Sequence, residues 1–310
     1  MAEQETQKIS MRDITLEQLL EAGCHFGHQV TRSNPKARDF IFEARDGIHI
    51  IDLAKTKEGL EEAAKYLKNL GKNPGSTLLI VGTKRQSHEV LIKEIERAKG
   101  QIKGDSGLYY VTNKWIGGLL TNFQEVSKNF KKLIDLTHNL ATPSAQEGYT
   151  KKEIGGWGKE REKLNGFYGG VFQMTRRPDA LFIIDARLED LAVREALRMN
   201  VPSVAMVDTN ADPALVDYPI PANDDAVGSL ELIIGYLMDA WAEGKNSIKE
   251  EKPKDEKKPE AKKAKSGASA QELVAEALKE EAAKEAKKAP AKKAEKAPKK
   301  AAKKTTEKKS

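Results

Sequence analysis

The chain has 310 residues, 53 Lys plus Arg against 47 Asp plus Glu, and a single cysteine, Cys24. One cysteine excludes an internal disulfide and fits a reducing compartment. No apolar run approaches the ~20 residues of a membrane helix, and the first ten residues lack the basic start and apolar core of a signal peptide, so we expect a cytoplasmic protein.

The charge is unevenly divided along the chain. Residues 245–310 contain 22 Lys and no Arg against 12 Asp plus Glu, whereas residues 1–244 contain 31 basic against 35 acidic residues. The tail therefore produces the whole positive excess, and net charge alone does not make the rest of the chain a nucleic-acid-binding protein. Any such role has to rest on local groups of Lys and Arg.

The beginning of the chain predicts a leader, a helix and a hairpin. After a polar leader over residues 1–10, residues 14–22 are predicted as a short helix, in which Thr15 and Gln18 can form a capping box. Asp46-Gly47, between two apolar runs, is a strong signal for a β-hairpin.

The segment 24–38, predicted as a loop, carries basic residues and possible metal ligands. Three basic residues have no acid between them: Arg32, Lys36 and Arg38. Three residues are potential zinc ligands: Cys24, His25 and His28. No second Cys or His pair with zinc-finger spacing follows, so the alternative is that these histidines pack and hydrogen-bond the loop against the domain.

Short apolar runs alternating with helical patterns predict a parallel sheet covered on both faces. The expected strands are Leu78–Val81, Leu108–Val111, residues 181–184 and Ser203–Val207. The expected helices are residues 53–70, 90–98, 188–199 and 226–242. In the third helix, Leu188 and Leu191 are predicted on the inner face with Ala192, Ala196 and Met199. Strand, crossover helix and strand over about 30 residues make a right-handed parallel unit.

Residues 122–171 show a different periodicity. Phe123, Val126, Phe130, Leu133 and further apolar residues recur at alternating spacings of three and four, which is typical of a coiled-coil seam. A similar alternation returns after a turn, so we predict an antiparallel helical hairpin that projects from the sheet domain. Three glycines lie within the second arm and predict a frayed or bent start: Gly155, Gly156 and Gly158.

The tail, residues 245–310, consists mainly of Lys, Ala, Glu and Pro. It has too few branched and aromatic side chains to offset the entropy of ordering, so we expect it to be disordered. Residues 269–288 are a possible helix, because Ser269 and Glu272 match a capping box.

Ligands of parallel α/β sheets bind at the carboxyl ends of the strands, where this chain places both acids and bases. Asp185 and Asp208 allow an α/β enzyme acting on a phosphorylated metabolite as one hypothesis. However, no glycine fingerprint for dinucleotides and no phosphate-binding loop is present, and nothing links a nucleophile, a base and an orienting group. We expect no catalytic residue, no cofactor and no metal.

Basic residues in four loops favour contacts with a phosphate backbone instead. The candidate RNA-binding residues are Arg32, Asn34, Lys36, Arg38, Lys84, Arg85, Asn113, Lys114, Trp115, Arg176 and Arg177. For each loop taken alone, the ordinary interpretation is a solvated surface charge. A third hypothesis makes the tail a general polycation for nucleic acid.

Several multi-residue blocks appear together and in a fixed order. They are residues 19–28, 34–36, 47–53, 113–122, 178–185, 207–210 and 220–226. In these blocks the chain resembles the bacterial small-subunit ribosomal protein S-two family, over about residues 11–244. The glycines of the second hairpin arm and the long Lys/Ala-rich tail depart from the family pattern.

The resemblance implies a non-enzymatic structural component of the small ribosomal subunit. It implies a three-layer α/β fold with a flavodoxin-like or Rossmann-like parallel sheet over residues 11–121 and 172–244, and a protruding coiled-coil hairpin over 122–171. The partners it implies are small-subunit ribosomal RNA and neighbouring ribosomal proteins including S-one, which the family helps to seat. No membrane and no small-molecule substrate is expected.

Overall fold

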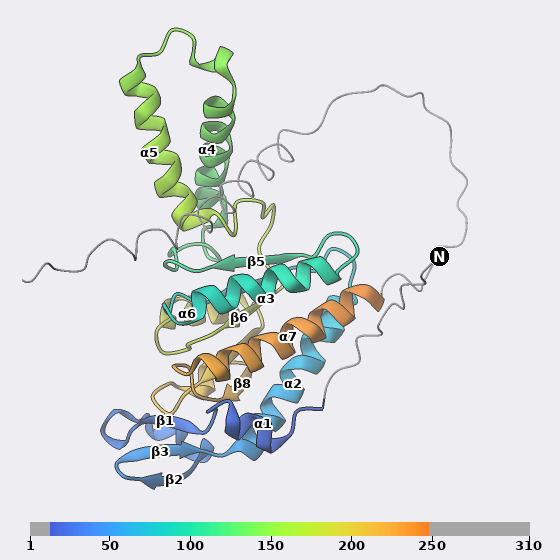
Figure 1. Ribbon diagram of the computed structural model, residues 1–310. Helices are drawn as coiled ribbons and strands as arrows, with labels where there is room; N and C mark the ends of the chain where they lie inside the picture. Colours follow the sequence, from blue (N-terminus) through green and yellow to red (C-terminus); the bar gives the residue numbers. More distant parts are fainter. Residues whose placement is uncertain (1–12, 248–310) are drawn as a thin grey trace, which may run out of the picture.

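The structure is a computed structural model that describes residues 13–247 (Figure 1). The predicted leader at residues 1–10, the predicted helix at 269–288 and the tail from residue 248 lie outside these residues. Residues 245–247 were predicted as disordered but form the end of the last helix, in which Lys245 is buried. Within residues 13–247, no helix combines the length and the apolar character needed to cross a membrane.

A five-stranded parallel sheet forms the centre of the molecule (Figure 1). Its strands are β4 (Leu78–Val81), β5 (Leu108–Val111), β6 (Ala180–Ile183), β7 (Ser203–Val207) and β8 (Tyr218–Pro221). They lie in the order β5-β4-β6-β7-β8, which is the flavodoxin-like arrangement of the Rossmann-like folds. β4 and β6 pair in register from Leu78 opposite Ala180 to Val81 opposite Ile183. The four predicted strands are therefore confirmed.

Helices cover both faces of this sheet and produce the predicted three layers. α2 (Leu53–Gly71), α3 (Ser87–Gln101) and α7 (Val227–Ser247) pack on the face that Ile80, Phe182 and Met206 point to. α6 (Asp190–Met199) and the segment after β5 pack on the other face, against Leu79, Leu181 and Ala205. Successive strand residues alternate between these two cores because side chains in a strand alternate in direction.

Two sequence features of the sheet were predicted wrongly or not at all. Leu188 and Leu191 were expected on the inner face of a helix over residues 188–199 but are 55% and 52% exposed. α6 begins only at Asp190, after Leu188, and Ala192, Val193 and Ala196 occupy its inner face. β8 was not predicted, since two of its four residues are proline, and proline is confined to edge strands.

A second, antiparallel sheet of three strands lies at the end of the molecule near α1 (Leu16–Glu21), which begins with the predicted capping box of Thr15 and Gln18 (Figure 1). Its strands are β1 (Phe26–Gln29), β2 (Ile41–Arg45) and β3 (Ile48–Ile51). Asp46 and Gly47 have positive φ in the predicted hairpin turn. The expected loop at 24–38 instead contains β1 and the short 3-10 helices η1 (Val30–Arg32) and η2 (Pro35–Phe40).

The helices α4 (Phe123–Ala141) and α5 (Lys151–Tyr168) pair as a hairpin that projects beyond β5 (Figure 1). The short helix η3 (Pro143–Gln146) connects them, as η4 (Pro213–Leu215) connects β7 to β8. α5 is helical through all three glycines and begins with a capping box of Thr150 and Glu153, so the glycines do not interrupt it. At the root, the backbone N–H of Tyr110 in β5 donates to the carbonyl of Gly170.

Candidate functional site

The carboxyl ends of β4, β6 and β8 meet at one charged cluster. Lys84, which follows β4, lies with its Nζ 2.8 Å from Asp224 Oδ1, 2.7 Å from Asp225 Oδ1 and 3.5 Å from Asp185 Oδ2. Only 17% of the Lys84 side chain and 1% of the Asp224 side chain are exposed. The lysine therefore ties the loops after three strands together.

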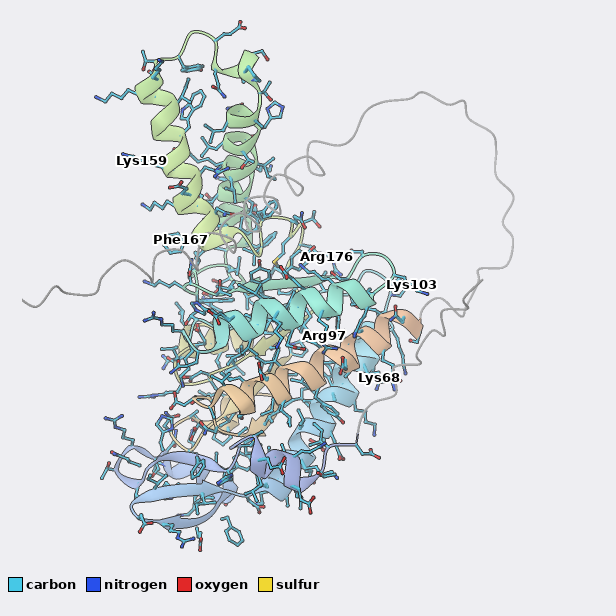
Figure 2. All side chains as sticks on the ribbon, viewed as in Figure 1. Lys68, Arg97, Lys103, Lys159, Phe167 and Arg176 are labelled. Carbon is cyan, nitrogen blue, oxygen red and sulfur yellow. The ribbon has the colours of Figure 1, made fainter. Side chains whose placement is uncertain are left out.

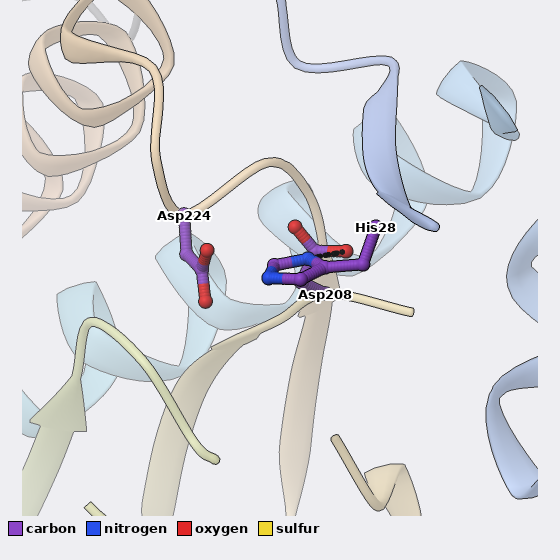
Figure 3. Close-up of side chains that lie close together, drawn as sticks. All are labelled: His28, Asp208 and Asp224. Atoms are coloured by element: carbon purple, nitrogen blue, oxygen red, sulfur yellow. Dashed lines mark ion pairs between the residues drawn. The ribbon is translucent and has the colours of Figure 1, made fainter. Parts of the chain in front are cut away.

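His28 of β1 joins the same cluster from the small sheet (Figure 3). Its Nδ1 lies 3.1 Å from Asp208 Oδ1, and its Nε2 lies 3.9 Å from Asp225 Oδ2. The backbone N–H of His28 also donates to Thr209 Oγ1 at 2.9 Å. The cluster thus fixes the three-stranded sheet against the loop that follows β7.

The cluster shifts the pKa values of its members. Burial raises the pKa of Asp224, and the neighbouring charges of Asp185 and Asp208 raise it further, to about 7, because Lys84 offsets only part of the effect. Burial alone would lower the pKa of Lys84, but the aspartates outweigh it and raise that pKa. The hydrogen bond with Asp208 raises the pKa of His28, although burial opposes it.

Side chains bridge the place where such folds bind substrates, and a small cavity of about 180 Å³ lies beside it, between the loops that follow β6 and β7. The strand order reverses between β4 and β6, and the crevice at that point is where α/β proteins hold ligands. Thr83 Oγ1 donates to Glu189 across it, and Lys84 reaches Asp185. A cavity of about 630 Å³ lies elsewhere, lined by Ile14, Gln18, Arg97, Tyr236 and other residues of α1, α3 and α7.

The two acids of the enzyme hypothesis have structural roles. Asp185 Oδ1 accepts hydrogen bonds from the backbone N–H groups of Arg187 and Leu188, both at 2.8 Å, and so shapes the turn into α6. Asp208 accepts from the Thr209 hydroxyl and pairs with His28. Both carboxylates therefore hold loops at the carboxyl edge of the sheet.

The zinc set considered from the sequence is not assembled. Cys24 is buried within the hydrophobic core, and burial raises the pKa of its thiol. Among residues 13–247, the group with ligand atoms within 4.8 Å of one another is His28, Asp208 and Asp224. One nitrogen and two carboxylate oxygens are donors that a divalent cation accepts, but Asp224 is already neutralised by Lys84.

The loop between β5 and α4 is organised by a residue that the sequence did not reveal. Glu195 of α6 accepts hydrogen bonds from Trp115 Nε1 at 3.2 Å, Gly118 N at 2.7 Å and Leu120 N at 3.1 Å. It also accepts from the backbone N–H of Thr121 at 3.2 Å and from its hydroxyl at 3.1 Å. Burial favours the neutral acid, but these donors outweigh it and lower the pKa of Glu195.

Several of the candidate RNA-binding residues make internal contacts. Lys36 pairs with Asp212 at 2.6 Å, and the Asn34 side chain caps η2 by accepting from Lys36 N. Asn113 donates to the carbonyl of Gly166 in α5, and Trp115 is buried. Together with Lys84, these residues hold loops in place at the carboxyl edge of the sheet.

Four other candidates remain exposed at that edge: Arg32, Arg38, Arg85 and Lys114. Arg176 and Arg177 lie elsewhere, because they precede β6 and therefore stand at the amino edge of the sheet. There Arg176 pairs with Asp179 at 2.8 Å and donates to the carbonyl of Gly75. The structure thus separates the eleven predicted residues into exposed cations, loop-holding residues and a pair at the opposite edge.

The fold and its charged cluster define a three-layer α/β protein that presents charged loops at the carboxyl ends of its parallel strands. A family model described as "Ribosomal protein S2" matches residues 19–244. The "Small ribosomal subunit protein uS2" of Coprothermobacter proteolyticus is 48% identical over 235 residues, which cover 76% of this chain and 84% of that protein. The chain therefore belongs to the ribosomal protein S2 family.

Two further relatives carry the same name. The protein of Corynebacterium glutamicum strain ATCC 13032 is 43% identical over 271 residues, 86% of this chain and 96% of the relative. The protein of Fusobacterium nucleatum is 41% identical over 246 residues, which cover 79% of this chain and 96% of the relative. The family membership confirms the predicted resemblance and the prediction of a non-enzymatic, ribosome-associated protein of the cytoplasm.

Proposed function

We propose that this chain binds small-subunit ribosomal RNA and acts there as a scaffold. Family membership is the observation that carries the proposal. As the family resemblance implies, the chain also helps to seat the RNA-binding protein S-one. The exposed Arg32, Arg38, Arg85 and Lys114 supply the phosphate contacts, since cations on loops at one edge give a fixed positive surface.

The loop-holding residues support this function indirectly. Lys84 and Glu195 fix the loops that carry Arg85 and Lys114, so the exposed cations stand at defined positions before RNA arrives. Preorganised side chains lose less conformational entropy on binding than mobile ones. RNA contact by the internally paired Lys36, Lys84, Asn113 and Arg176, and by Asn34, Trp115 and Arg177, stays a prediction.

We further propose that the hairpin packs as a coiled coil. Val126, Phe130, Leu133 and Thr137 are buried in α4 and recur at spacings of four, three and four. Ring contacts support the pairing, because Phe130 lies edge-on to Tyr168 of α5 with 5.4 Å between ring centroids.

Sedimentation through a sucrose gradient tests the proposal. We expect the full chain to travel with the small subunit and to bind a transcript of small-subunit ribosomal RNA. The variant R32A/R38A/R85A/K114A should bind the transcript more weakly and lower the salt slope by about three to four units, one for each lost contact. A matched control, K65A/K72A/K103A/K131A, removes four exposed lysines of other elements. Failure of the wild-type chain to bind would refute the proposal.

A truncated chain separates the body from the tail as the source of binding. The truncation belongs after Ser247, because α7 continues to that residue and Lys245 is buried, with its Nζ 2.5 Å from the carbonyl of Ser76. We expect residues 1–247 to stay associated with the small subunit at physiological salt. Complete loss of association would favour the tail as the binding element.

A further inference from the structure

The helix α5 presents one face that the hairpin does not use. Lys152, Lys159, Lys163 and Phe167 are all exposed and follow one another at spacings of seven, four and four residues. Such spacings place side chains on one side of a helix. In Figure 2, Lys159 and Phe167 lie along the side of α5 that faces away from α4. These four residues define the outward face of α5.

The lysines of this face differ from those of the neighbouring helix. On α4, Lys128 pairs with Glu125 at 2.7 Å and Lys132 pairs with Glu160 of α5. Within residues 13–247, no ion pair or hydrogen bond engages the ammonium groups of Lys152, Lys159 and Lys163. The outward face therefore carries positive charge that the protein itself does not neutralise.

The remaining features of this face suit a long polyanion. A rise of about 1.5 Å per residue separates the lysines by about 10 Å and 6 Å along the helix. Gly155 and Gly156 lie between the first two lysines and have no neighbour within 4 Å of an added Cβ, so no side chain obstructs the space beside them. Of the acids of α5, Glu153 is held in the capping box and Glu160 pairs with Lys132 of α4, which leaves Glu162 at the side of the row.

The lower end of the face is continuous with a loop already assigned to RNA. Phe167 is 37% exposed, although a ring of this size is usually buried. The residue before it, Gly166, accepts the hydrogen bond of Asn113, and Lys114 follows directly. Phe167 and Lys114 thus stand on adjoining segments at the root of the hairpin, where an unpaired base could stack on the ring.

We propose that the outward face of α5 is a second RNA-contact surface, in which the three lysines bind phosphates and Phe167 stacks on an unpaired base. The proposal rests on the proposed RNA-binding function and extends it from the sheet edge along the hairpin. It assigns different roles to the two residue types: the lysines determine the salt dependence, whereas Phe167 contributes a contact that salt does not screen.

Binding of full-length variants to a transcript of small-subunit ribosomal RNA between 50 and 200 mM salt tests the proposal. The variant K152A/K159A/K163A should lower the salt slope by about two to three units, so that over this fourfold range of salt wild type loses about 16- to 64-fold more affinity than the variant. F167A should weaken binding about fivefold or more with an unchanged slope. The control K65A/K103A/K131A removes three exposed lysines from other surfaces, one of them on α4.

The outcomes separate the two proposals. All substituted side chains are exposed, so circular dichroism should show an unchanged fold. If wild type does not bind the transcript, the proposed function fails. If wild type binds and the α5 triple variant keeps the slope and affinity of the control, the outward face of α5 is not an RNA-contact surface. Protection of Lys159 from acylation in isolated small subunits is expected, and free reactivity there would also overturn the proposal.

Discussion

Replacing the buried Glu195 by alanine should strongly destabilise the protein, because its carboxylate accepts five hydrogen bonds. Two of its five donors, Trp115 Nε1 and Leu120 N, are in buried surroundings. Each would lose its partner at a cost of about 1–3 kcal/mol, and water can reach the other donors at a smaller cost. We therefore expect Glu195→Ala to lower the free energy of unfolding by about 3–5 kcal/mol.

Urea denaturation measures this effect, with Glu96→Ala as the control for an exposed carboxylate. The control should change stability by less than about 0.5 kcal/mol. Glu195→Gln keeps one oxygen acceptor but turns an NH₂ group toward N–H donors, so its cost should lie between the two. The slope of the transition should be unchanged, because the denatured chain exposes the same surface. A loss below about 1 kcal/mol for Glu195→Ala would show that water replaces the carboxylate fully.

The lowered pKa of Glu195 predicts that the free energy of unfolding decreases at acidic pH. The pKa of Glu195 is lower in the folded protein than the usual value of about 4.3, so its stabilisation is complete above that value and is lost as the pH falls through the folded pKa. Wild type should therefore lose stability faster than Glu195→Gln below about pH 4. Parallel curves for the two proteins would contradict the hydrogen-bond explanation.

Three other changes test the cluster and the hairpin. Lys84→Met leaves buried aspartates without their cation and should cost about 3–5 kcal/mol, whereas Arg85→Ala should leave stability unchanged and lower the RNA salt slope by about one unit. Asp208 raises the pKa of His28, so the protonated histidine stabilises the folded protein fully below about pH 6.5, and this stabilisation is lost as the pH rises through the folded pKa. The free energy of unfolding of His28→Gln should therefore depend less on pH in this range than that of wild type. Gly156→Ala should raise stability by up to about 1 kcal/mol, since an added Cβ has free space in a helix.

Each of these has a measurable contrary result. Equal urea midpoints for Lys84→Met and Arg85→Ala would show that Lys84 does not stabilise the fold. A His28→Gln curve as steep as wild type above pH 6.5 would assign the titration to another group. A lower melting temperature for Gly156→Ala would mean that the helix requires the glycine.

Local sequence patterns predicted the buried strands and the capping box of the first helix, because those features depend on neighbouring residues. The apolar run at Leu78–Val81 is fully buried as expected, and the capping box of Thr15 is present. The pattern failed where tertiary context decides the burial. Periodicity placed Leu188 and Leu191 on the inner face of the predicted helix, but α6 begins after Leu188 and buries Ala192, Val193 and Ala196 instead.

The organisation of the site could not be predicted, because its contacts join distant parts of the chain. Lys84 and Asp224 are 140 residues apart, and Glu195 is 80 residues from Trp115. The sequence therefore indicated which loops carry charge but not which cations are neutralised within the protein. That distinction separates Lys84, which holds the fold, from its neighbour Arg85, which is exposed.

Both borders of the central sheet are closed to another chain. At the β5 border, the backbone N–H of Tyr110 already donates a hydrogen bond to the carbonyl of Gly170. At the β8 border, Pro219 and Pro221 have no N–H to donate. Open strand borders can pair with the strands of other chains and so promote aggregation. The hairpin root and the two prolines therefore oppose edge-to-edge association between copies of this protein.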